Sequence, residues 1–79
     1  MTYIGIDISK DSFVAAYPTK SGYTTKTFNN DTKGVRQFIK SLPDESHCVM
    51  EATGNYSMLL LYLLQQAGIL VSMENPQKI

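Results

Sequence analysis

The order of its predicted elements constrains this chain most: three β-type segments come first, and helices then alternate with strands. Residues 2–9 place isoleucine at every second position, which is the period of a half-buried strand. Two more β-type segments, residues 13–17 and 23–28, follow after polar turns, and Pro18 is expected to close the earlier one. The short connections predict an antiparallel meander of three strands.

A first helix is predicted after this meander. Apolar residues recur there at i, i+3, i+4 and i+7, as on the buried face of an amphipathic helix: Val35, Phe38, Ile39 and Leu42. The preceding Asn-Asn-Asp-Thr run supplies N-cap candidates, and the next proline stops the helix.

Two further strands are predicted in the second half. Residues 47–53 are apolar apart from Glu51 and a flanking His and Thr, which is typical of a central parallel strand. Residues 69–73 form the last strand, which Pro76 ends. The predicted order is therefore β-β-β-α-β-α-β, and right-handed crossovers would place the fourth strand beside the first. This is the α/β topology of a ribonuclease-H-like mixed sheet, which we expect to be truncated before its closing helix.

The helix between these strands is unusually apolar. It is expected to begin at residues 54–57 and to run to about Ala67, and residues 58–64 are apolar all round. Such a helix should be buried on more than one side. A partner subunit or residues beyond Ile79 would have to cover it. We therefore expect residues 1–79 to be the N-terminal part of one domain in a longer protein that forms a homo-oligomer.

Two acidic residues are the best candidates for chemistry. Asp7 lies among three isoleucines, which favours a position inside the first strand over a strand end that only accepts turn amides. Glu51 lies at the exit of the fourth strand, where it could instead simply face water. Carboxylates on neighbouring strands repel each other unless a cation lies between them, and Mg²⁺ or Mn²⁺ prefers such oxygen ligands. A two-metal phosphoryl-transfer site would need further acids.

Other residues offer contacts to phosphates. Thr53 and Asn55 precede the second helix, where free backbone amides gather, and Lys10 lies in the first turn. Simple capping and turn roles are the alternative for all three. Residues 10–40 carry six Lys or Arg against two Asp, whereas residues 41–79 carry one Lys against four acids. This asymmetry is compatible with one face that touches phosphates, or with a solvated surface of mixed charge.

Composition excludes several classes of protein. Cys48 is the one cysteine, so an internal disulfide is impossible and a reducing cytosol fits. The longest purely apolar run, residues 58–64, is far shorter than the roughly 20 residues of a membrane span. We expect no membrane partner.

Three motifs carry a resemblance to a known family. Residues 4–11 read Ile-Gly-Ile-Asp-Ile-Ser-Lys-Asp, residues 50–56 read Met-Glu-Ala-Thr-Gly-Asn-Tyr, and residues 75–78 read Asn-Pro-Gln-Lys. Together, in this order, they resemble the N-terminal half of the DEDD transposases of the insertion-sequence one-ten type and the related DNA invertases. The resemblance covers essentially the whole chain.

The resemblance implies a metal-dependent, RuvC-like nuclease domain that acts in DNA transposition or site-specific recombination. Asp7 and Glu51 would be the first two acids of the catalytic tetrad and would bind Mg²⁺ or Mn²⁺. The remaining two Asp, and a separate domain with a serine nucleophile, would follow Ile79, so we expect the fragment alone to be inactive. DNA would be the partner, together with a guide RNA in some members. The protein would be cytoplasmic, in a bacterium or archaeon, and associated with the nucleoid.

Two alternatives remain open at this point. The N-terminal lobe of an actin-like ATPase or sugar kinase shares this topology, although its phosphate-binding turn needs a glycine that residues 8–11 lack. A module that dimerises through the apolar second helix is the non-enzymatic reading.

Overall fold

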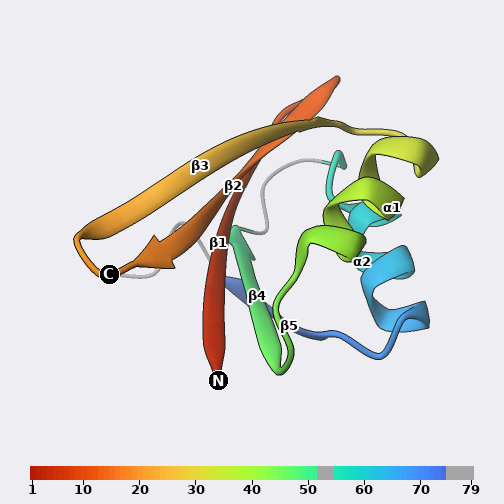
Figure 1. Ribbon diagram of the computed structural model, residues 1–79. Helices are drawn as coiled ribbons and strands as arrows, with labels where there is room; N and C mark the ends of the chain where they lie inside the picture. The colour runs from red at the N-terminus through yellow and green to blue at the C-terminus, as the bar shows by residue number, and fades with distance from the viewer. Residues whose placement is uncertain (52–54, 75–79) are drawn as a thin grey trace.

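The computed structural model describes residues 1–51 and 55–74 of the chain. It contains one five-stranded mixed sheet and two helices (Figure 1). The elements are β1 (Thr2–Ile8), β2 (Ser12–Thr19), β3 (Gly22–Asn29), α1 (Thr32–Ser41), β4 (Ser46–Glu51), α2 (Met58–Gln66) and β5 (Leu70–Glu74). The predicted α/β class and element order are confirmed, and this is the architecture of the N-terminal part of a ribonuclease-H-like fold.

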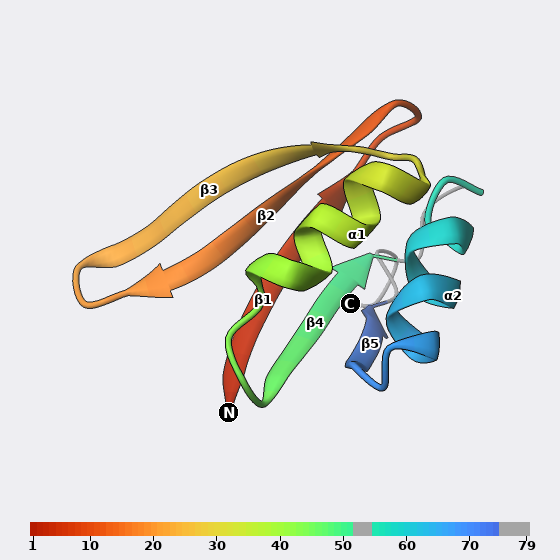
Figure 2. The ribbon, with the colours of Figure 1, turned by 45° about the vertical axis from the view of Figure 1, so that its right-hand side comes forward.

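The strands lie in the spatial order β3-β2-β1-β4-β5. The pairs β1–β2 and β2–β3 are antiparallel, whereas β4 runs parallel to both β1 and β5. The predicted placement of the fourth strand beside the first is thus confirmed. Both crossovers advance in the same direction across the sheet, so their common right-handedness puts both helices on one face. Figure 2 shows α1 and α2 side by side over that face, and no described element covers the other.

The hydrophobic core lies between the sheet and the two helices. Strand alternation sends Ile4 and Ile6 of β1 into it, as the sequence predicts. Phe38 of α1 packs on two aromatic rings of the sheet, with centroids 5.3 Å from Phe13 and 5.4 Å from Phe28. The other fully buried hydrophobic residues of the core are Ala15, Val35, Cys48, Met50, Leu60 and Leu64.

The start of α1 is fixed by a cap and a close approach. The Asp31 carboxylate accepts a hydrogen bond of 2.7 Å from the backbone N–H of Gly34. Gly34 is buried against the end of β3, where a Cβ atom would overlap the carbonyl oxygen of Asn29. Glycine is therefore required there for the helix to approach the strand.

Two expectations about element ends are wrong. Pro18 does not close β2, which continues to Thr19 with Pro18 opposite Tyr23. The pairing of β1 with β2 stops at Ala16, so Pro18 has a neighbouring strand on one side only, where proline is tolerated. The second helix begins at Met58, later than expected.

The burial expected for the apolar second helix is also not met within the described residues. Only Leu60 and Leu64 of α2 are fully buried, whereas Met58 and Tyr62 are 65% and 59% exposed. The reason is that α2 packs against the sheet and α1 with one side only, and no described element lies over its other side. Its outer face remains apolar and open.

Candidate functional site

The two predicted acids lie at the same edge of the sheet. The parallel register of β1 and β4 runs from Thr2 opposite Ser46 to Ile6 opposite Met50. Continued by one residue, it sets Asp7 beside Glu51. Because Ile6 and Met50 are buried beneath the helices, alternation turns both acids to the open face. The structure thus brings the two carboxylates to one face and one end of adjacent strands.

Asp7 lies inside β1, as expected, and is the last residue but one of the strand. It is exposed because no described element covers its face of the sheet, on which Tyr3 and Gly5 are exposed as well. Glu51 is the last residue of β4, as expected, and is also exposed. Burial therefore places little cost on either charge. The argument for a cation between them depends on the mutual repulsion of neighbouring carboxylates.

A third acid, which was not predicted from the sequence as a site residue, lies at this edge of the sheet. Glu74, the last residue of β5, lies directly opposite Glu51 in the parallel register and is exposed on the same face. Its signal was present in the sequence, since a strand of residues 69–73 extended by one residue ends on an acid. Among residues 1–51 and 55–74, however, no three His, Cys, Asp or Glu side chains gather closely enough to hold a metal ion.

Asn30 ties together the segments that follow the two acids. Its side-chain amide donates to the backbone carbonyls of Ser9, at 3.1 Å, and Tyr56, at 2.9 Å. Ser9 directly follows β1, and Tyr56 lies between β4 and α2. A longer contact of 3.4 Å reaches the carbonyl of Lys10. The sequence suggested Asn30 only as an N-cap candidate, a role that Asp31 takes.

Of the three residues predicted to contact phosphates, the two that the structure describes lie near the ends of β1 and β4 that carry the acids. Lys10 is exposed in the turn between β1 and β2, and Asn55 is exposed before α2. Thr53 lies outside the described residues. Neither Lys10 nor Asn55 carries a side-chain hydrogen bond that gives it another structural role within the described part of the chain.

His47 lies on the same open face as the acids, nearer the start of β4. His47 on β4 and Ser72 on β5 share a hydrogen bond of 2.6 Å between Nε2 and Oγ. The Tyr3 ring of β1 lies over the His47 ring, with centroids 5.2 Å apart. These contacts satisfy His47 through its neighbours, which is a structural role.

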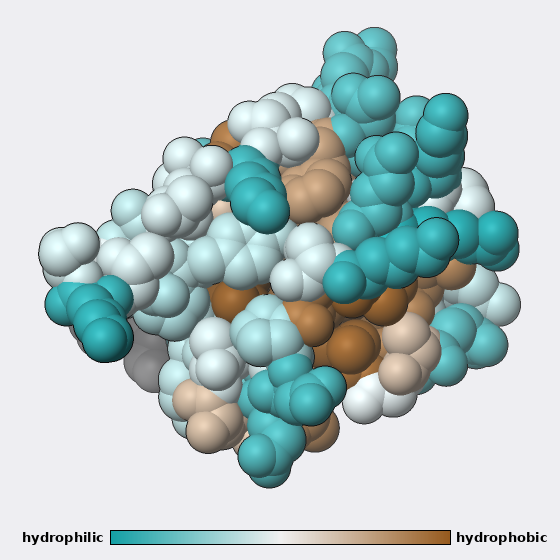
Figure 3. Space-filling model, in the orientation of Figure 1, coloured by the Kyte–Doolittle hydropathy of each residue, from teal (hydrophilic) through white to brown (hydrophobic). Residues whose placement is uncertain are grey.

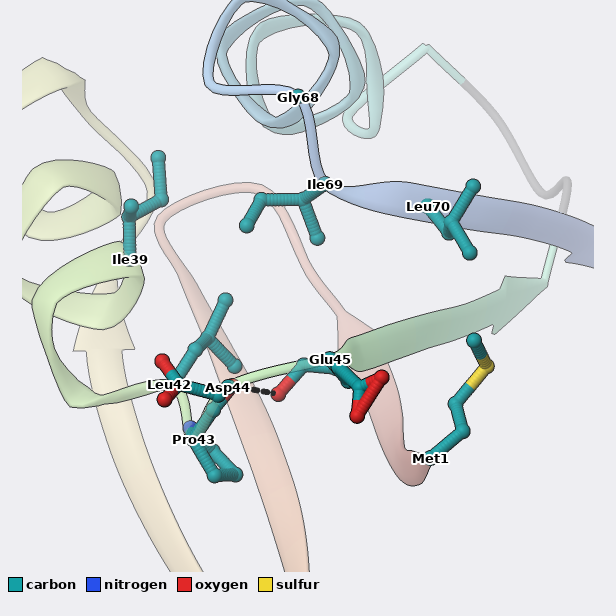
Figure 4. Close-up of a pocket in the computed structure, with 10 residues that line it drawn as sticks. Met1, Ile39, Leu42, Pro43, Asp44, Glu45, Gly68, Ile69 and Leu70 are labelled. Atoms are coloured by element: carbon teal, nitrogen blue, oxygen red, sulfur yellow. Dashed lines mark hydrogen bonds between the residues drawn. The ribbon is translucent and has the colours of Figure 1, made fainter.

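A cavity of about 350 Å³ opens at the opposite end of the sheet from the acids. Figure 4 shows around it Ile39 near the end of α1, Leu42 just after that helix, and Ile69 just before β5. Asp44 and Glu45 are at its rim. Since this cavity lies at the starts of β4 and β5, it does not belong to the edge that carries Asp7.

Cys48 offers no nucleophile. It is fully buried on β4, and burial raises the pKa of its thiol to about 11. The reactive thiolate is therefore scarce at neutral pH.

Comparison with known proteins identifies the family. A model of the DEDD transposases of the IS110 type, described as "Transposase", matches residues 4–79. No curated protein matches the chain significantly. Within the part of the chain that the structure describes, no helix is long and apolar enough to cross a membrane. The match covers nearly the whole sequence and the strands that carry both acids, and the chain therefore belongs to the IS110-type DEDD transposase family.

Proposed function

We propose that this chain contributes Asp7 and Glu51 to a Mg²⁺- or Mn²⁺-dependent site that cleaves and transfers DNA strands in transposition or site-specific recombination. Membership of a transposase family supports DNA as the partner. The observation that carries the proposal is the β1–β4 register, which sets the two acids beside each other at the open edge of the sheet.

The donor set fits a hard divalent cation. Both carboxylates are exposed, so they are free to bind a metal ion. The remaining positions of such an ion would be filled by water and by phosphate oxygens. Such a cation would polarise a phosphoryl oxygen and lower the pKa of a bound water. The role of Asp7 and Glu51 is to hold negative oxygen ligands at a fixed spacing on two rigid strands.

Two acids leave this site incomplete. The family resemblance implies two further Asp after Ile79, so we infer that residues 1–79 are the N-terminal part of one RuvC-like domain. Assembly of a homo-oligomer and recognition of a guide RNA would belong to the whole protein. Lys10, Thr53 and Asn55 would meet phosphates beside the acids.

The test is Asp7→Asn in the full-length protein, measured as excision and insertion of a marked element. We expect transposition to be abolished, with an unchanged circular dichroism spectrum, because the amide keeps the shape and removes the charge. Asp11→Asn is the matched control, since Asp11 is an exposed acid in the turn four residues away, and it should leave transposition intact. Normal transposition by the Asp7→Asn protein would refute the assignment.

The alternative of an actin-like ATPase lobe finds little support in the turn after β1. The backbone N–H of Ser9 donates to the carbonyl of Ser12 at 2.8 Å, and the Ser9 hydroxyl donates to the same oxygen at 3.0 Å. These donors are already engaged and are not free to cradle a nucleotide phosphate. A nucleotide titration of the full-length protein that showed tight binding would favour this alternative.

A further inference from the structure

The outer face of α1 carries a stripe of positive charge. Lys33, Arg36 and Lys40 are exposed and are spaced by three and four residues, so they align on the side of the helix away from Phe38. No acidic residue occurs between Thr32 and Ser41. Figure 3 shows hydrophilic side chains gathered over this helix.

The stripe also borders a hollow of about 460 Å³ on the helix surface. Thr32, Lys33, Arg36, Gln37 and Lys40 line it, so each lining side chain can donate a hydrogen bond. Three of the five are cations, which suits an anionic occupant. The stripe from Lys33 to Lys40 is about 10 Å long at the α-helical rise, a length over which each strand of B-DNA presents about three phosphates.

The stripe begins at the end of the molecule that carries the acids. The Asn30 side chain, two residues before α1, is bonded to Ser9 and Tyr56, and the backbone N–H of Asn30 donates to the carbonyl of Asp11 at 2.9 Å. The first turn of α1 is thereby fixed beside the turn that follows Asp7. The later cations lead away from this edge along the helix.

The two faces of the sheet differ sharply in charge. Alternation places Asp7, Glu51 and Glu74 on the open face, and no Lys or Arg of the described strands shares that face. The phosphate backbone of DNA is repelled by these acids unless a cation is bound between them, whereas the cations of α1 attract it. The flanking duplex is therefore expected to lie against the helix side.

We propose that the Lys33–Arg36–Lys40 stripe of α1 docks the phosphate backbone of duplex DNA that flanks the reacting strand. This docking deepens the proposed function by naming the surface that holds the DNA. The binding itself does not depend on the proposed function; only the role of the bound duplex in strand transfer rests on it. The contacts are to phosphates, so they position the duplex without reading its sequence.

The experiment measures binding of the full-length protein to a fluorescent duplex of about 30 base pairs and arbitrary sequence, in EDTA, across a range of salt concentrations. The variant is Lys33→Gln/Arg36→Gln/Lys40→Gln, which removes three charges while keeping good helix formers. Each lost phosphate contact should lower the salt slope by about 0.9, so the slope should fall by between about 2 and 3. At about 0.15 M salt, affinity should fall on the order of 100-fold.

Lys20→Gln in the turn between β2 and β3 is the charge control, and it should lower the slope by less than about 0.5. An unchanged slope in the triple variant would overturn the proposal, as would an equal loss per charge in the control. Loss of binding to structured RNA with normal binding to duplex DNA would also overturn it. Failure of the metal site is separate, because a cleaving Asp7→Asn protein would refute that site without altering the binding slopes in EDTA.

Discussion

Replacing Gly34 by alanine tests how closely α1 must approach β3. Gly34 is buried in the first turn of α1, and a Cβ atom there would overlap the carbonyl oxygen of Asn29. The same Cβ would lie 2.8 Å from the carbonyl carbon and 3.0 Å from the nitrogen of Asn29. The obstructing atoms all belong to the backbone, so no flexible side chain can move aside, and the helix or the strand end must shift.

Two effects of opposite sign set the size of the change. Helix propensity alone favours alanine over glycine by up to about 1 kcal/mol. Overpacking costs about 1 to 3 kcal/mol. A displaced Asn29 would also weaken the hydrogen bonds of its neighbour Asn30, which are worth about 1 kcal/mol each. The overlap should win, so we expect Gly34→Ala to lower the free energy of unfolding by about 2 kcal/mol.

Urea denaturation followed by circular dichroism measures this change. Gln37→Ala, on the exposed face of the same helix, is the matched control, and it should change the free energy of unfolding by no more than about 0.5 kcal/mol. A Gly34→Ala protein as stable as the wild type, or more stable, would refute the close approach of α1 to Asn29.

Three more predictions follow from the described contacts. Asn30→Ala should lower the free energy of unfolding by about 1 to 2 kcal/mol, since it removes two good hydrogen bonds together with a buried Oδ1 that has no described partner. Asn30→Asp should be less stable still, because a carboxylate would face carbonyl oxygens. A urea midpoint equal to that of the wild type in either variant would contradict the role of Asn30. Cys48 should resist thiol reagents at pH 8 unless the protein unfolds. Because burial raises the pKa of Cys48 to about 11 from 9.0, its contribution to stability is complete below pH 9 and is lost as the pH rises through 11, and Cys48→Ala should abolish this loss in alkaline urea titrations. Tyr62→Glu should reduce the oligomeric order measured by light scattering, because Met58 and Tyr62 form an exposed apolar patch on α2; an unchanged molar mass would count against contact through this face.

Local pattern alone determined the element types and the two acids. Isoleucine at every second position of β1 predicts a strand with one buried face, and the same alternation predicts that Asp7 lies on the opposite face. The spacing of Val35 and Phe38 predicts the buried face of α1. These predictions hold because side-chain period depends on residues a few positions apart, which any sequence displays directly.

Only the tertiary structure decided the features that depend on register and close approach. The alignment of β4 with β5 placed Glu74 beside Glu51, and the end of the β1–β2 pairing made room for Pro18 inside β2. Asn30 bonds across 21 and 26 residues to Ser9 and Tyr56, which no local pattern indicates. Contacts of this kind arise when distant segments meet, because their distances are set by the packing of whole elements and not by the period within any one of them.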